Sequence, residues 1–225
     1  MTLDPQDLFS AFIVVATMLL VGFPVHEFMH AWTAMKLGDN TARWMGRVTL
    51  DPRVHFDQMG ALILAVTAVF SAVGGGLLFG WAKPTPVNPI NMRYGRRGHA
   101  LVAFAGPASN LVTAALVALV IRAIIWANPS VSPLLELSWT TLWLLLWLNI
   151  VLFIFNLIPI PPLDGWSVVK GIVPAQMSRR MSELEIQYAN VIPMLFFGFI
   201  IILFVTGGTL LLPIIDGIAN ILVGR

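Results

Sequence analysis

The sequence contains no cysteine, so it can form neither a disulfide bond nor a thiolate zinc site. Any bound metal must therefore use His, Asp or Glu side chains. Charge is scarce as well, at 11% of the 225 residues against roughly 25% in an ordinary soluble domain. Neighbouring basic residues occur only as pairs, at Arg96-Arg97 and Arg179-Arg180. A nucleic-acid-binding segment needs a longer basic run, so we expect no nucleic-acid partner.

Apolar residues dominate what is present. The hydrophobic fraction is 58% and the mean hydropathy is +0.85. Several apolar runs reach the roughly 20 residues that a helix needs to cross a bilayer, and the alternating segments of about ten residues that build a membrane barrel do not occur. The sequence therefore predicts an all-α integral membrane protein, with residues 1–225 as one membrane-embedded domain. Because the first residues, MTLDPQD, are acidic, we expect no cleavable signal peptide.

The apolar runs predict about four to five transmembrane helices. They lie at about 8–37, 59–79, 100–127, 137–158 and 189–223. Pro24, inside the first run, is expected to kink that helix just before two histidines. The polar residues 39–57 also contain β-favouring and aromatic side chains and predict a short β-like strand or hairpin near the surface.

Basic residues indicate how these runs are oriented. They concentrate in the loops 36–57, 80–99 and 159–187, and are missing from 1–7 and 128–138. Under the positive-inside rule the basic loops face the cytoplasm, whereas the N-terminus and 128–138 lie outside. We therefore expect a multi-pass protein of the cell membrane.

The run 59–79 does not fit as a simple span, because both of its ends would be cytoplasmic. A re-entrant hairpin that turns near Gly74–Gly76 satisfies the charge pattern, and irregular backbone is tolerated at membrane depth where it lines a polar cavity. We predict such an element beside a cavity. An ordinary span with one basic loop outside stays open as the alternative.

Residues 26–30 read HEFMH within an otherwise apolar stretch. On a helix, positions i and i+4 share one face, so His26 and His30 can bind one ion, with Glu27 beside them as a general base. The pattern is expected in roughly one shuffled sequence in a thousand. Ionisable groups are costly in a membrane and usually functional there. A pair of hydrogen-bonded core histidines is the competing interpretation.

A catalytic zinc ion takes three protein ligands, so a third must be found. His55 and His99 lie in polar loops and are read as solvated or interfacial. Glu136 falls on the outer side of the charge pattern, and Asp216 is read as a turn residue. Asp164 remains.

The context of Asp164 supports this choice. It follows the run 137–158 on the side where the histidines approach the cytoplasm. The prolines of NLIPIPPLDG end the helix and favour an extended segment, and Gly165 permits a close approach of the backbone. An Asp-Gly turn is the alternative interpretation.

These residues resemble the site-2 proteases, which are intramembrane zinc metalloproteases. The resemblance rests on HEFMH at 26–30, NLIPIPPLDG at 156–165, FAGPASN at 104–110 and GWAKPTPVNP at 80–89. It implies that His26, His30 and Asp164 bind Zn²⁺ and that Glu27 is the base. It also implies that Asn156 positions substrate or polarises its carbonyl, and that Asn110 borders the site as a further substrate-binding residue. The chain has no room for the PDZ or CBS domains of many members, so we expect a minimal, membrane-only member.

We therefore expect peptide hydrolysis within transmembrane segments of other membrane proteins, at an active site toward the cytoplasmic side. A helix must be unwound before cleavage, and residues 45–50 or the PVNP segment at 86–89 are candidate strand edges to hold it. The alternatives are a membrane zinc transporter and a non-catalytic protein that binds membrane proteins. The oligomeric state is left open.

The assignment of Asp164 predicts the zinc content of a variant. Purified wild-type protein should hold about one zinc ion per chain, and Asp164→Ala should lose most of it because a three-ligand site is reduced to two. Metal analysis of the two proteins checks this. Equal zinc content would remove Asp164 from the site.

Overall fold

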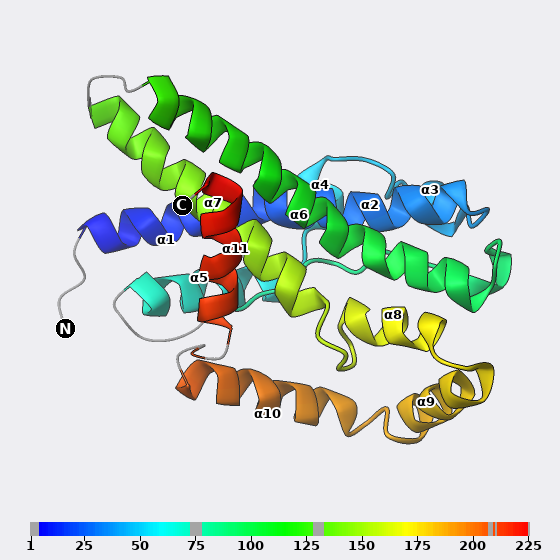
Figure 1. Cartoon of the computed structure of the whole chain (residues 1–225). Coiled ribbons are helices and arrows are strands. Elements are labelled where there is room, and N and C mark those ends of the chain that lie inside the picture. The colour runs from blue at the N-terminus through cyan, green and yellow to red at the C-terminus, as the bar shows by residue number, and fades with distance from the viewer. Residues whose placement is uncertain (1–4, 73–77, 128–132, 207–208, 210, 225) are drawn as a thin grey trace.

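The structure is a computed structural model, and it describes residues 5–72, 78–127, 133–206, 209 and 211–224. Within these residues every regular element is helical (Figure 1). The first half contains α1 (Pro5–Thr17), the π-helix η1 (Met18–Gly22), α2 (Phe23–Lys36), α3 (Thr41–Trp44), α4 (Pro52–His55), α5 (Gln58–Ala72) and the 3₁₀ turn η2 (Pro89–Asn91). The second half contains α6 (Arg96–Ala127), α7 (Pro133–Asn156), α8 (Asp164–Ile172), α9 (Ala175–Gln187), α10 (Ile192–Val205) and α11 (Leu212–Val223).

Three of these helical stretches are long and apolar enough to cross a membrane: Leu8–Lys36, Arg96–Ala127 and Ser138–Asn156. A fourth candidate is the pair α9 and α10, which is bent by 94°. The chain is thus a helical membrane protein with three to four candidate spans in its described part. The expectation of four to five is not confirmed, because α5 and α11 are shorter apolar helices. The final apolar run is divided into α10 and α11.

The first span is continuous through Pro24. Five residues just before it, Met18–Gly22, form a π-helical turn, and Pro24 occupies the first turn of α2. A proline is tolerated there because first-turn N–H groups have no intrahelical partner. A π-helical turn therefore lies directly before the proline, a feature often found at functional sites, and the kink expected at Pro24 stays a prediction.

The expected strand or hairpin in residues 39–57 is wrong. The segment forms the short helices α3 and α4, joined by turns and irregular chain. Proline at the first position and the Asp51 side chain, which accepts a hydrogen bond from Arg53 N, favour the start of α4. Capping thus favours a short helix at 52–55, whereas Val48 and Thr49 lie in bends between the two helices.

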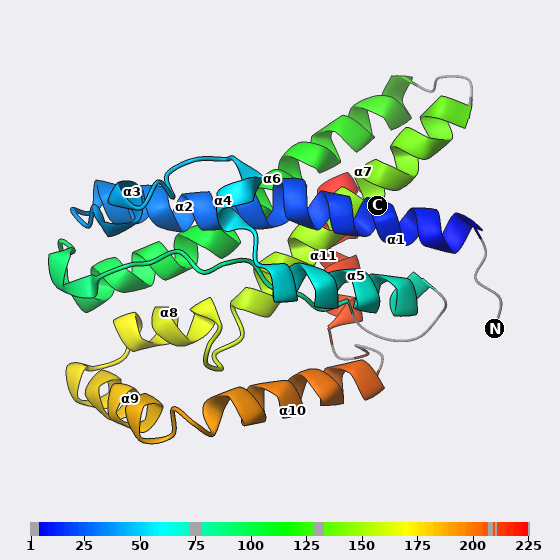
Figure 2. The same cartoon turned by 180° about the vertical axis from the view of Figure 1, so that it is seen from behind.

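The chain segments before and after α5 lie next to each other. Lys83 N donates to His55 O at 2.9 Å, so the segments before and after α5 are adjacent. Between them, Thr67 Oγ1 donates to Phe79 O at 2.8 Å and ties the returning chain to α5. This adjacency agrees with a re-entrant element, which stays a prediction. The proposed turn at Gly74–Gly76 lies outside the described residues. Figure 2 shows α5 alongside α1, against which it packs.

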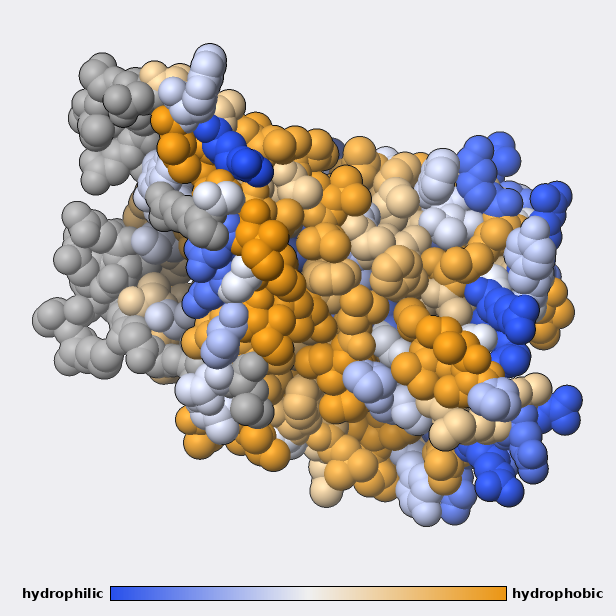
Figure 3. All heavy atoms as spheres, viewed as in Figure 1, coloured by the Kyte–Doolittle hydropathy of each residue, from blue (hydrophilic) through white to orange (hydrophobic). Residues whose placement is uncertain are grey.

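Helix α6 is the centre of the packing. It contacts α2, α7 and α8, which carry the candidate site residues. Its small buried residues Ala114 and Ala118 let α7 and α11 approach closely, forming a core with Ile121 and Ile150. Hydrophilic residues gather at the end of the molecule where α3, α9 and the start of α6 lie, and apolar residues cover the middle (Figure 3).

The packing of the returning chain on α5 predicts the effect of a methyl group. A Cβ at Gly60 would lie 2.1 Å from Trp81 O, so Gly60→Ala should destabilise the protein by about 1–3 kcal/mol. Gly217→Ala is the matched control, because a Cβ there meets nothing within 4 Å. Thermal unfolding in detergent should show a lower midpoint for Gly60→Ala alone. A midpoint equal to that of the control would show that the returning chain is not docked as described.

Candidate active site

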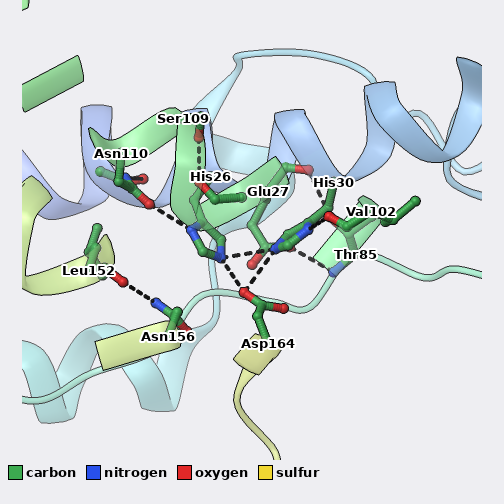
Figure 4. A network of polar contacts seen from close by, with 12 residues as sticks. His26, Glu27, His30, Thr85, Val102, Ser109, Asn110, Leu152, Asn156 and Asp164 are labelled. Atoms are coloured by element: carbon green, nitrogen blue, oxygen red, sulfur yellow. Dashed lines mark hydrogen bonds and ion pairs between the residues drawn. The ribbon is translucent and has the colours of Figure 1, made fainter. Parts of the chain in front are cut away.

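Three side-chain atoms from distant parts of the chain converge at one point. His26 and His30 lie one turn apart on α2, and Asp164 is the first residue of α8. His26 Nε2 lies 3.0 Å from His30 Nε2, and Asp164 Oδ2 lies 3.1 Å from the first and 3.3 Å from the second. Figure 4 shows the three groups pointing toward one another. The arrangement therefore brings together the two histidines and the carboxylate named from the sequence.

The outer nitrogens of the two imidazoles contact oxygen atoms of α6. His26 Nδ1 lies 2.7 Å from Asn110 Oδ1, and His30 Nδ1 lies 2.7 Å from the Val102 carbonyl. These oxygens only accept, so each Nδ1 carries the proton and donates it. Each Nε2 is then an unprotonated lone pair, the state in which imidazole binds a metal. Two such lone pairs face each other at 3.0 Å, an arrangement that a cation between them stabilises.

The spacing of the three atoms fits a small tetrahedral ion. Ligands about 2.0–2.1 Å from zinc lie roughly 3.3–3.4 Å apart in a tetrahedron, and the observed separations are 3.0 to 3.3 Å. Two imidazoles and one carboxylate are also a recognised donor set for catalytic zinc. Gly106 of α6 makes the site possible, since a Cβ there would lie 2.3 Å from His30 Nε2 and 2.8 Å from His26 Nε2. The residues present fit zinc.

Glu27 is held beside this cluster by the extended chain before α6. Its Oε2 accepts a hydrogen bond from Thr85 N at 2.8 Å, and its backbone carbonyl accepts one from Thr85 Oγ1 at 3.1 Å. Pro84 and Pro86 have no N–H, so Thr85 supplies the only amide donor of this tripeptide. Sequence analysis did not identify Thr85. The signal was its position between two prolines in the segment GWAKPTPVNP.

Asp164 is placed by close packing between α7 and α8. A Cβ at Gly165 would lie 2.2 Å from Leu157 O, so only glycine lets the start of α8 approach the end of α7. Gly165 thus permits the close approach that the sequence suggested.

Comparison with known proteins assigns the chain to a family. The model of peptidase family M50 matches residues 123–203. YwhC of Bacillus subtilis is 35% identical over 207 residues, covering 88% of this chain and 84% of the relative. The chain belongs to peptidase family M50. Rip2 of Mycobacterium tuberculosis is 32% identical over 196 residues, covering 87% of this chain and 71% of the relative. Both relatives carry names that propose a zinc metalloprotease. No solved structure matches the chain.

This M50 peptidase is therefore a zinc metalloprotease of the site-2 protease family, and its apolar helices agree with an intramembrane enzyme. Membership decides between the functions that the sequence left open, because the comparisons give no support to a zinc transporter or a non-catalytic binding protein.

The two asparagines suggested by the resemblance occupy different places in this M50 peptidase. Asn156 lines the cavity in front of the cluster, and its Nδ2 donates to Leu152 O at 2.9 Å. Asn110 is fully buried behind His26 and contacts that imidazole. Its side chain is 0% exposed, so in this structure it reaches the site through His26.

His55 and His99, read as solvated or interfacial from the sequence, are both at least partly buried. His55 is buried at 2% exposure and its Nε2 lies 2.8 Å from Thr49 O, so it stabilises the fold of the segment before α5. His99 is half-buried on α6 and lines the cavity beside Asp164 and His30. His55 was misread because the polar stretch around it looks exposed in the sequence, whereas the folded chain covers it. The interfacial interpretation of His99 stays a prediction.

A cavity of about 480 Å³ lies in front of the cluster in this M50 peptidase. One wall is aromatic: Phe79 contacts Trp81, Phe196 and Phe197, with ring centroids 5.9 to 6.4 Å apart. Phe155 adds a further contact to Phe196. The polar lining includes Glu27, Thr85, His99, Asn156 and Asp164. The lining thus combines an aromatic wall with the polar side chains of the candidate metal site.

The extended segment along the cavity is anchored by Asp39, which follows α2. The buried carboxylate of Asp39 accepts hydrogen bonds from Asn88 N at 2.6 Å and from Thr41 Oγ1 at 2.6 Å. Burial disfavours the anion, but these donors outweigh burial and keep the pKa of Asp39 below its ordinary value. A lowered folded pKa contributes stability at neutral pH, which is lost as the pH falls through that value.

The close contact of Gly106 with both imidazoles predicts the effect of adding a methyl group at this position. Gly106→Ala should push the two rings aside and weaken zinc binding by about tenfold or more, the scale on which disturbing such supporting contacts acts. Gly198→Ala in α10 is the matched control, because its Cβ meets nothing within 4 Å. Competition with a chelator measures both affinities. Zinc binding by Gly106→Ala as tight as that of the control would contradict this geometry.

Proposed function

We propose that His26, His30 and Asp164 hold the catalytic zinc ion of this peptidase and that Glu27 is the general base. The observation that carries the proposal is the convergence of two unprotonated imidazole nitrogens and one carboxylate oxygen, beside Glu27 and open to a cavity. When bound, zinc supplies a Lewis acid that lowers the pKa of water and polarises a carbonyl.

Side chains of the protein transfer the proton and position the substrate carbonyl. Thr85 N–H holds one oxygen of the Glu27 carboxylate, and the other oxygen takes the proton of the attacking water. Glu27 then passes that proton to the leaving amine. Asn156 uses one amide hydrogen for Leu152 O and offers the second to the carbonyl oxygen of the substrate. Asn110 orients His26 and does not contact substrate.

The substrates we propose are transmembrane segments of other membrane proteins. The aromatic wall of Phe79, Trp81, Phe196 and Phe197 suits apolar side chains of such a segment. The extended backbone at 84–88 runs along the cavity and offers an edge for an unwound stretch. Of the two edges considered from the sequence, this leaves the PVNP segment, because residues 45–50 are turns and irregular chain.

We further propose that the active site opens toward the cytoplasm and that residues 1–225 form one membrane-embedded domain of the cell membrane. The basic loops 36–57, 80–99 and 159–187 support this orientation. The adjacency of His55 and Lys83 supports α5 as a re-entrant element within the bilayer. Shared packing of α2, α7 and α8 on α6 supports a single domain.

Glu27→Gln tests the proposed chemistry. The amide cannot accept the proton, so cleavage of a single-pass membrane substrate should fall by about 10²–10⁴-fold. Zinc content should stay near that of the wild type, because Glu27 is not a ligand. Cleavage in reconstituted vesicles and metal analysis of the same sample check both. Retained cleavage would rule out Glu27 as the base, and loss of zinc with cleavage would show that it supports the metal instead.

A further inference from the structure

A second buried asparagine lies behind Asn110. Asn149 is on α7, and both asparagine side chains are 0% exposed. Asn110 Nδ2 donates to Asn149 Oδ1 at 2.9 Å, and Asn149 Nδ2 donates to Leu145 O at 2.8 Å. With the bond between His26 and Asn110, this makes a continuous polar path from α7 through α6 to the metal site.

The direction of every hydrogen bond in this path is determined by backbone carbonyls. Leu145 O only accepts, so the amino group of Asn149 faces it and the oxygen of Asn149 faces Asn110. Gly22 O, at the end of the π-helical turn, accepts from Asn110 Nδ2 at 3.2 Å. Both hydrogens of the Asn110 amino group are thereby used, and its oxygen must point to His26 Nδ1.

The orientation of Asn110 determines which nitrogen of His26 carries the proton. A correctly oriented Asn110 can only accept from His26, so the proton of His26 stays on Nδ1 and Nε2 stays free for metal. His30 needs no such support, because its Nδ1 partner is the backbone carbonyl of Val102. The orientation of His26 thus depends on side chains, and a change at Asn149 would leave an unpaired N–H on Asn110 in a buried, apolar place.

We propose that Asn149 is a positioning residue of the metal site, which orients Asn110 and through it keeps His26 in the tautomer that binds zinc. The proposal rests on the assignment of His26 as a zinc ligand. Asn149 does not touch the cavity or the substrate, and it acts entirely through Asn110.

The test measures zinc affinity of the full-length protein in detergent, by competition with a chelator and with zinc alone as the probe. Asn149→Leu removes both hydrogen bonds at similar volume and should weaken zinc binding about three- to tenfold, less than the 10–100-fold of a direct partner such as Asn110. Asn149→Asp keeps an oxygen facing Asn110 and, protonated in this buried apolar place, donates its hydroxyl to Leu145 O, so it should restore affinity to within about twofold.

Two controls separate positioning from general stability. Leu146→Ala creates a cavity at a fully buried position on the same helix, and it should lower the thermal midpoint while zinc affinity stays within about twofold of wild type. In an Asn110→Leu background, Asn149→Leu should have no further effect on zinc affinity, because the path is already broken.

Independent, additive losses from Asn110→Leu and Asn149→Leu, or unchanged zinc affinity in Asn149→Leu, would overturn the proposal. A loss in Leu146→Ala equal to that in Asn149→Leu would overturn it too, because packing alone would then explain the effect. Failure of the proposed metal site looks different, since the wild type and Asp164→Ala would then bind zinc alike.

Discussion

Both imidazoles of the site donate their Nδ1 protons to oxygen atoms of α6, and the chemistry depends on this pair of hydrogen bonds. They leave two nitrogen lone pairs 3.0 Å apart, directed at the carboxylate of Asp164. In an apolar helix such a cluster is costly unless a cation compensates it. The requirement for zinc therefore follows from the contact between α2 and α6, which only a glycine at position 106 permits.

The parts around this cluster have a common purpose, which is to hold polar groups in a mostly apolar protein. Prolines remove donors on both sides of Thr85, so its single N–H can be assigned to Glu27. Asp39 uses its carboxylate to hold Asn88 and so keeps the extended segment along the cavity. The π-helical turn ends at a carbonyl that accepts from Asn110. Each of these contacts gives a backbone or side-chain polar group a hydrogen-bond partner within the protein.

Prediction from the sequence succeeded where one helix contains the whole signal. The five residues HEFMH place two imidazoles on one face through helical geometry alone, and the apolar runs around them identify the spans of α1 to α2, α6 and α7. It failed at 39–57, where the chain forms the short helices α3 and α4 in place of a strand or hairpin. There the outcome depended on a small balance of local energies that composition does not reveal.

The sequence by itself identified the class of protein and named His26, His30 and Glu27 as candidate site residues. It could do so because hydropathy and helical spacing act over a few neighbouring residues. Family resemblance and elimination added Asp164. Only the tertiary structure decided that Asp164 reaches His26 across 138 residues, that Thr85 holds Glu27 across 58, and that Asn149 contacts Asn110 across 39. Such contacts depend on how α7, α8 and the extended segment pack on α6. No local pattern encodes that packing, because it results from close-fitting surfaces of many residues far apart in the chain.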